Sequence, residues 1–179
     1  YALYGPLLMG AKTILIEKPM SLINETLFKK ILLNEKVNIL YLPVTLIRLM
    51  RSIDKKIKIK SKYLKTLGSM GEPLSKHIGS WFSKKFSFKS LQIVNAYYQT
   101  ENSAILASPK FNDNIKKVSF GTVGKQVNNI LGIFLEKLNS NKSELKIRNP
   151  WPGCMIGIIN GREQFKKYWD NKSNFRLFD

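Results

Sequence analysis

The chain has 179 residues, of which 44% are apolar and 11% aromatic, a composition typical of a globular protein and not of a disordered one. Thirty lysines and arginines against twelve acidic residues give a formal net charge of +18, which favours anionic partners. No apolar run approaches the roughly 18 residues that a membrane-spanning helix needs, so we expect no membrane association.

The densest cationic run, 55–62, alternates lysine with isoleucine and contains no arginine or aromatic residue. A groove that binds nucleic acid usually contains arginine and aromatic side chains among its lysines. We therefore interpret the run as solvated surface and keep an anion-attracting function as the alternative. A basic nucleic-acid-binding module is disfavoured because no known module matches, so we expect no nucleic-acid partner.

Single cysteine and histidine residues limit the chemistry of the chain. Because Cys154 is the single cysteine of the sequence, an internal disulfide and a cysteine-cluster metal site are excluded. This fits a cytoplasmic protein. Cys154 has no nearby basic partner, so we expect it to be inert. His77 is expected at the surface. The start at Tyr1 shows neither an initiator Met nor a signal peptide, and we expect an internal piece of a longer protein.

In chain order, the first two-thirds alternates strand and helix patterns. After a small helix, the apolar residues 13–16 predict a strand. Asn24 is expected to cap a helix that places Leu27, Phe28, Ile31 and Leu32 on one face. The apolar run 37–42 predicts a strand buried on both faces. The inward side of the helix that follows is predicted to hold Leu46, Leu49, Met50 and Ile53.

Residues 64–70 predict another strand, and Pro73 and Ser75 are expected to open the next helix. The apolar positions of that helix are Ile78, Trp81 and Phe82. Residues 91–97 predict a fourth strand. This alternation predicts an α/β fold, with a parallel sheet and flanking helices, followed by a smaller β-rich part.

The helical period ends near Pro109. Residues 127–138 and 145–148 predict antiparallel strands joined by 139–142, and residues 162–169 predict a short helix. We therefore expect an α/β subdomain at 1–111 and a β-rich subdomain at 112–179. Trp151-Pro152-Gly153 is typical of a turn.

Two motifs carry chemistry. Gly71-Glu72-Pro73 lies between a predicted strand and helix, where free N–H groups and the helix dipole can hold an anion; an ordinary strand–helix turn is the alternative. In Asn95–Glu101, aromatic residues lead into Gln99, Thr100 and Glu101. Ligands bind beyond the carboxyl ends of strands in open α/β sheets. The aromatics suit a base or acyl group, and Thr with Glu suits phosphate and a hard cation; a core edge capped by Thr100 is the alternative.

The motifs occur in a set order along essentially the whole chain: YGPLLMGA at 4–11, VNILY at 37–41, TLIR at 45–48, LGSMGEP at 67–73, YYQTE at 97–101, WPG at 151–153 and YW at 168–169. This ordered set resembles the AMP-forming acetyl-coenzyme A synthetases, the short-chain branch of the adenylate-forming superfamily. The resemblance implies part of the large N-terminal domain of such an enzyme.

The resemblance also implies a ligase reaction. ATP and acetate form acetyl-AMP and pyrophosphate, and coenzyme A then takes the acetyl group; Mg²⁺ is the implied metal. Thr100 and Glu101 are the implied catalytic residues, with Thr100 at the phosphates and Glu101 at the metal. The implied nucleotide-binding residues are Gly71, Glu72 and Pro73 at the adenine, Asn95, Ala96, Tyr97, Tyr98, Gln99 and Thr100 around the nucleotide, and Asp179 at the ribose.

The chain departs from the family pattern at several of these positions. Asn95 replaces an Asp, which removes a negative charge beside the nucleotide, and Tyr97 and Tyr98 replace two tryptophans. The resemblance places the second tryptophan at the acyl pocket, so Tyr98 implies a slightly larger, more polar pocket and leaves acetate or propionate open. The family's phosphate loop is expected before Tyr1 and its C-terminal, lysine-bearing domain after Asp179. The chain by itself is therefore not expected to catalyse the reaction, and a non-catalytic nucleotide-binding remnant stays an alternative.

Overall fold

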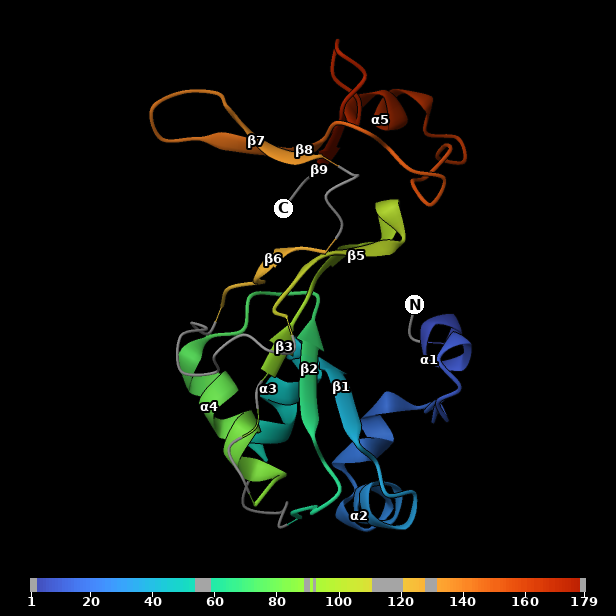
Figure 1. Cartoon of the computed structure of the whole chain (residues 1–179), viewed down its shortest axis with the longest axis vertical. Coiled ribbons are helices and arrows are strands. Elements are labelled where there is room, and N and C mark those ends of the chain that lie inside the picture. The colour runs from blue at the N-terminus through green and yellow to red at the C-terminus, as the bar shows by residue number, and fades with distance from the viewer. Residues whose placement is uncertain are drawn as a thin grey trace. The chain divides into compact units, whose positions relative to one another are not determined.

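The computed structural model describes residues 3–53, 59–88, 91, 93–110, 121–127 and 132–177. The predicted ribose ligand Asp179 and residues 55–58 of the cationic run lie outside these ranges. The described fold is α/β, with a parallel three-stranded sheet, flanking helices and antiparallel β-structure (Figure 1). The predicted fold class is confirmed.

Two compact units make up the chain. The first combines Tyr1–Tyr97 with Ser108–Lys125, and the second combines Tyr98–Ala107 with Gln126–Asp179. The predicted subdomain boundary at residue 112 stays a prediction. None of the helices within the described ranges is long and apolar enough to cross a membrane.

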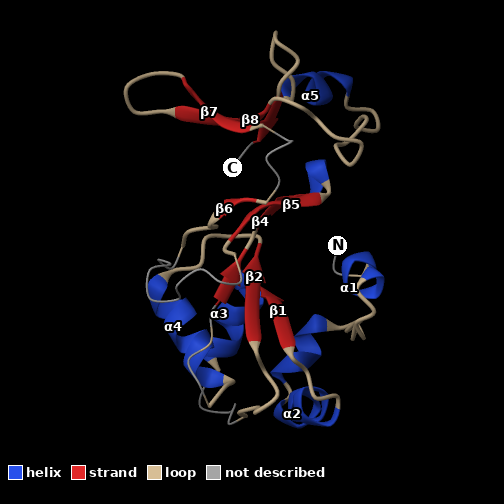
Figure 2. Ribbon diagram, viewed as in Figure 1, coloured by secondary structure: helices blue, strands red, loops and turns tan. Residues whose placement is uncertain are grey.

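Helices and strands alternate in the first part of the chain (Figure 2). The elements are α1 (Tyr4–Leu8), the 3₁₀ helix η1 (Pro19–Ile23), α2 (Glu25–Asn34), β1 (Ile39–Pro43), α3 (Val44–Ser52), β2 (Thr66–Met70), α4 (Lys76–Lys85) and β3 (Ile93–Asn95). The rest of the chain contains β4 (Tyr97–Gln99), the 3₁₀ helix η3 (Thr100–Asn102), β5 (Ala104–Ser108), β6 (Lys125–Gln126), β7 (Ile133–Lys137), β8 (Ser143–Ile147), α5 (Arg162–Lys167) and β9 (Phe175–Leu177).

The sheet of the first unit has the order β1-β2-β3, and its strands are parallel. Leu40, Leu67 and Ile93 are buried in neighbouring strands, and α2, α3 and α4 add their apolar sides to the same core. Phe86 lies edge-on to three rings of this core, those of Phe28, Trp81 and Phe82, at centroid distances of 5.2, 5.8 and 5.9 Å. Most apolar positions of the helical stripes predicted from sequence thus face a common core. Leu27 is an exception at 37% exposed, Leu49 is only half-buried, and the fully buried Ile47 was not predicted.

The cap predicted at Asn24 is confirmed. Its side-chain Oδ1 accepts a hydrogen bond from the Leu27 N–H at 3.1 Å, which satisfies one of the free donors of the first helical turn. Phe28 and Leu32 are the buried residues of α2. Local sequence therefore defines both where this helix begins and which side it buries.

Residues 13–16 do not form the predicted strand. A strand needs a neighbour that completes its hydrogen bonds, and no described strand pairs with this segment. Leu15 is accordingly 65% exposed. The segment instead lines a groove of about 450 Å³, together with α2 residues; the lining residues are Lys12, Thr13, Ile14, Leu15, Leu27, Lys30, Ile31 and Glu35.

Two other strand predictions need correction. The run 37–42 was expected to be buried on both faces, but in β1 Leu40 and Leu42 are buried while Ile39 is 65% exposed, because only one face of this strand meets the core. The strand predicted at 91–97 divides at Ala96. Its N–H donates to the Ser69 carbonyl at 2.9 Å, and the chain then leaves the first sheet and enters the sheet β4-β5-β6.

The predicted antiparallel pair is confirmed with different bounds. In the second unit β7 pairs with β8, with Ile133 opposite Ile147 and Lys137 opposite Ser143, and β9 pairs with the other edge of β8. The predicted short helix is α5, which ends at Lys167. The strand β5, in contrast, has no counterpart in the sequence analysis.

Candidate functional site

The first group of site residues lies at the carboxyl end of β2. Gly71 has φ +91°, a left-handed conformation that glycine adopts without steric cost. The next residue, Glu72, forms an ion pair with Arg48 of α3 at 2.5 Å. Both side chains are more than one-third exposed, so the pair adds little stability, and its effect is to hold the Glu72 carboxylate at this sheet edge.

Asn95 is the last residue of β3, which pairs with β2, and it is only 4% exposed. The Ser69 hydroxyl donates to its Oδ1 at 2.9 Å. Its Nδ2 is buried and has no hydrogen-bond partner within the described part of the chain. Because buried polar groups are rarely left unpaired, this amide is suited to donate to a ligand at the carboxyl edge of the sheet.

The second group surrounds Glu101 in η3. Its two carboxylate oxygens accept hydrogen bonds from two hydroxyl groups: Thr100 donates to Oε2 at 3.1 Å, and Tyr168 donates to Oε1 at 3.2 Å. The Met155 N–H also donates to the Glu101 carbonyl at 2.7 Å. Side chain and backbone of Glu101 are therefore both held by neighbours.

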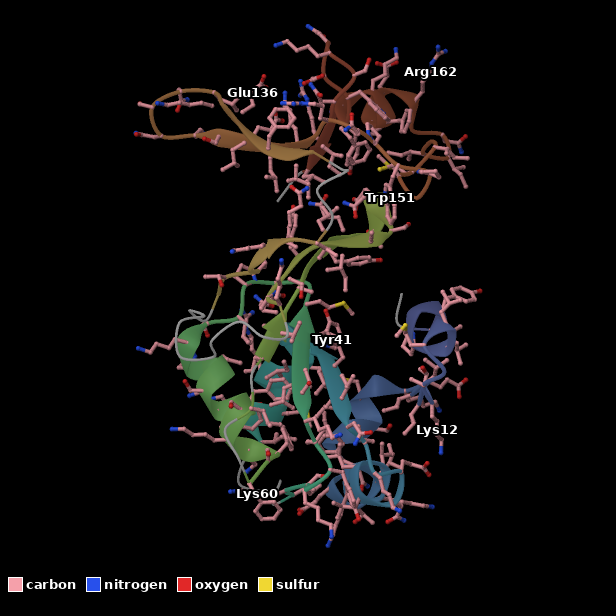
Figure 3. The ribbon with its side chains drawn as sticks, in the orientation of Figure 1. Lys12, Tyr41, Lys60, Glu136, Trp151 and Arg162 are labelled. Atoms are coloured by element: carbon pink, nitrogen blue, oxygen red, sulfur yellow. The ribbon has the colours of Figure 1, made fainter. Side chains whose placement is uncertain are left out.

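The predicted turn at Trp151–Gly153 is confirmed, and it contacts the same 3₁₀ helix. The Cys154 N–H donates to the Trp151 carbonyl at 2.9 Å. Trp151, labelled in Figure 3, donates from its indole Nε1 to the Asn102 carbonyl at 2.8 Å. A side chain on Gly153 would place its Cβ 2.9 Å from the indole, so glycine leaves room for the ring.

Electrostatics distinguish the reactive groups. Burial raises the pKa of Tyr168, and the charge and hydrogen bond of Glu101 raise it further, so the hydroxyl stays protonated and can donate. Burial also raises the pKa of the Cys154 thiol, which fits the prediction that this free cysteine is inert. His77 is exposed, as expected, with Nδ1 3.1 Å from the Ser75 hydroxyl oxygen.

No cluster of three or more His, Cys, Asp or Glu side chains suited to a metal occurs in the described ranges. Mg²⁺ does not require one, since it is usually held by one or two carboxylates together with substrate phosphates and water. Glu101, a partly exposed carboxylate beside the Thr100 hydroxyl, fits this manner of binding.

The structure thus describes the predicted site residues as two groups. Gly71, Glu72, Pro73, Asn95, Ala96 and Tyr97 belong to the first compact unit, and Tyr98, Gln99, Thr100 and Glu101 belong to the second. The binding roles of all these residues stay predictions. Sequence reasoning missed the contacts of Ser69, Arg48 and Tyr168 with site residues. All three stood in quoted motifs, but their partners are distant in sequence.

The comparisons with known proteins agree with the resemblance. The model of the AMP-binding enzyme family matches residues 1–150. Acetyl-coenzyme A synthetase of Rhodopirellula baltica is 31% identical, over 96% of this chain and 26% of its own length. That of Vibrio cholerae is 31% identical, over 93% and 26%, and acetyl-coenzyme A synthetase 2 of Candida albicans is 31% identical, over 97% and 26%. The chain spans about a quarter of the length of these relatives.

Proposed function

This chain belongs to the AMP-binding enzyme family, and on that premise we propose that it is part of an AMP-forming acetate–CoA ligase. The observation that carries the proposal is the similarity to acetyl-coenzyme A synthetases along 93–97% of the chain. The proposed substrates are ATP, acetate and coenzyme A, and a cytoplasmic location goes with them. Residues 1–111 are proposed as the nucleotide- and acyl-binding subdomain.

The proposed reaction has two steps. An acetate oxygen attacks the α-phosphorus of ATP, and the bond to the bridging oxygen breaks as pyrophosphate leaves. The sulfur of coenzyme A then attacks the acetyl carbon, the carbon–oxygen bond breaks, and AMP leaves. Such chemistry depends on positioning and charge neutralisation more than on a protein acid or base. The lone exposed His77 and the buried Cys154 are accordingly given no role.

The first group of residues is proposed to hold the nucleotide. Gly71, Glu72 and Pro73 form the edge against adenine. The buried Nδ2 of Asn95, which has no hydrogen-bond partner among the described residues, supplies a donor beside it. Tyr97, which is half-buried, offers a flat face to the base. Tyr98 of the second group, also half-buried, offers one to the acyl group. Because Tyr98 stands where the family has a tryptophan, propionate is the alternative acid.

The second group is proposed to act at the phosphates. Thr100 donates to them, and Glu101 binds Mg²⁺, which neutralises phosphate charge when bound. The support is geometric: one carboxylate carries two hydroxyl donors, and carboxylate oxygens keep further lone pairs for a cation.

A second candidate is a protein that binds nucleotide without completing the reaction. The observation that favours it is that Asn95, Tyr97 and Tyr98 differ from the residues that the family pattern has at these positions. This candidate uses the same residues to hold the nucleotide and the same Glu101, but it predicts no acetate-dependent chemistry.

Acetate-dependent exchange of labelled pyrophosphate into ATP, measured with the native protein that carries this chain, tests the proposal. We expect exchange in the wild type and a loss of at least about 100-fold in Glu101→Gln, since removing one preorganised electrostatic contact has effects of this size. Glu163→Gln, on the exposed side of α5, is the matched control. Nucleotide binding without exchange would favour the second candidate, and wild-type rates in Glu101→Gln would refute the assigned site.

A further inference from the structure

Glu101 is connected to a buried lysine through contacts within the second unit. The hydroxyl of Tyr168 reaches Oε1 of Glu101 across 67 positions of sequence, at 3.2 Å, while Thr100 occupies Oε2. With one donor on each oxygen, the carboxylate plane has a defined orientation. Thr100 is the sequence neighbour of Glu101, so Tyr168 is the contact that ties the carboxylate to another part of the fold.

Tyr168 is itself held firmly. Its ring packs against Phe175 with centroids 5.7 Å apart, and its carbonyl accepts the Arg176 N–H at 2.7 Å. Both partners belong to β9, so this strand fixes the backbone and the ring of Tyr168. The position of the hydroxyl follows from those two constraints.

The chain directly after Tyr168 is fixed by Asp170. One of its oxygens, Oδ1, accepts the N–H groups of Lys172 and Asn174, both at 2.8 Å. The other, Oδ2, lies 2.8 Å from Nζ of Lys146. These bonds close the turn between α5 and β9 and join it to β8, which carries Lys146.

Lys146 is unusual because its side chain is only 3% exposed. Its ammonium group forms ion pairs with Asp170, with Glu136 of β7 (Figure 3) and, at 3.2 Å, with Glu144. A buried charge is tolerated when partners surround it in this way. The ion pairs join β7, β8 and the turn that carries Tyr168 into one polar network.

We propose that Tyr168 is a positioning residue that orients the Glu101 carboxylate toward a divalent cation, and that the Lys146–Asp170 ion pair holds Tyr168 in place. This inference rests on the proposed function, in which Glu101 is the cation ligand. Partners that orient a metal-binding carboxylate typically change metal affinity by roughly 10- to 100-fold.

Binding of Mn²⁺ with α,β-methylene-ATP, in which the bond that the proposed reaction breaks is not cleavable, tests the inference by electron paramagnetic resonance on the native protein. Tyr168→Phe keeps the ring on Phe175 and removes only the hydroxyl. We expect it to weaken Mn²⁺ binding about 10-fold and to leave metal-free binding of α,β-methylene-ATP unchanged. Asp170→Asn, like Tyr168→Phe, should weaken Mn²⁺ binding. Tyr4→Phe, at a side chain that is 73% exposed, is the control.

Glu101→Gln separates the possible failures. If it weakens Mn²⁺ binding and Tyr168→Phe does not, the positioning role is wrong and the proposed function stands. If Glu101→Gln has no effect either, Glu101 is not a cation ligand, and both the metal assignment and this inference fail. An equal loss of metal-free nucleotide binding in Tyr168→Phe would show a general structural role and would also overturn the inference.

Discussion

Single residues in the middle of the parallel sheet show how closely side-chain size is matched there. Tyr41 of β1 lies opposite Gly68 of β2, and its ring covers the glycine (Figure 3 labels Tyr41). A Cβ on Gly68 would lie 1.9 Å from Cδ2 of that ring, far inside van der Waals contact. Gly68, the first glycine of the LGSMGEP motif, is therefore required by packing against the Tyr41 ring as well as by its place beside the site.

We expect Gly68→Ala to lower the free energy of unfolding by about 1–3 kcal/mol, the usual effect of overpacking. Urea denaturation followed by circular dichroism measures it. Gly5→Ala is the matched control, because a Cβ there meets no atom within 4 Å. Equal stabilities for the two variants would show that the Tyr41 ring moves aside without cost.

At the scale of elements, the starts of α2 and α4 differ in whether a local side chain caps the helix. Asn24 caps α2 through a side-chain hydrogen bond, whereas Ser75, the corresponding residue of α4, makes no such bond to its helix. Its hydroxyl instead lies 3.1 Å from His77 Nδ1. The two residue types are both favoured at helix starts, so only the structure shows which one acts as a cap.

Asn24→Ala should therefore destabilise the protein by about 1 kcal/mol, the typical value of a lost N-cap. Ser75→Ala, which removes no cap bond, should cost clearly less. Thermal unfolding of both variants under one buffer condition compares them directly. A larger loss in Ser75→Ala than in Asn24→Ala would contradict this account of the two helix starts.

For the whole molecule, charge links stability to pH. The formal net charge is +18, so protonating the twelve acidic residues adds to self-repulsion in the folded state. Among them, Asp170 has its pKa held below the ordinary value, first by the hydrogen bond from Lys146 and then by that from Asn174. The same contact with Asp170, followed by that with Glu136, raises the pKa of Lys146.

Because the pKa of Asp170 is lower in the folded than in the unfolded protein, its stabilisation is present above the unfolded value of about 4 and disappears as pH falls through the folded value. Asp170→Asn should consequently lower Tm most between about pH 5 and 8 and progressively less below pH 4. Melting curves across this range, with Glu163→Gln as an exposed control, measure the difference. A deficit that is the same at pH 7 and pH 3 would rule out this linkage.

Much of the fold follows from local patterns. The stripes of α2, α3 and α4, the cap at Asn24, and the hairpin that joins β7 to β8 were all predicted from residue spacing, because amphipathic periods and turn residues act over a few positions. The ordered motifs indicated the family for the same reason, since each motif is a short contiguous stretch.

Tertiary structure decided what depends on distant partners. Residues 13–16 have the composition of a strand, but no described strand pairs with them, and the predicted strand 91–97 divides at Ala96 between two sheets. The burial of Lys146 and the contact between Tyr168 and Glu101 join residues that are far apart in sequence. The sequence by itself determined the helices, some of the strands, the motifs and the family. Pairing, burial and the surroundings of Glu101 came only from the fold, because hydrogen bonds and ion pairs depend on distance in space.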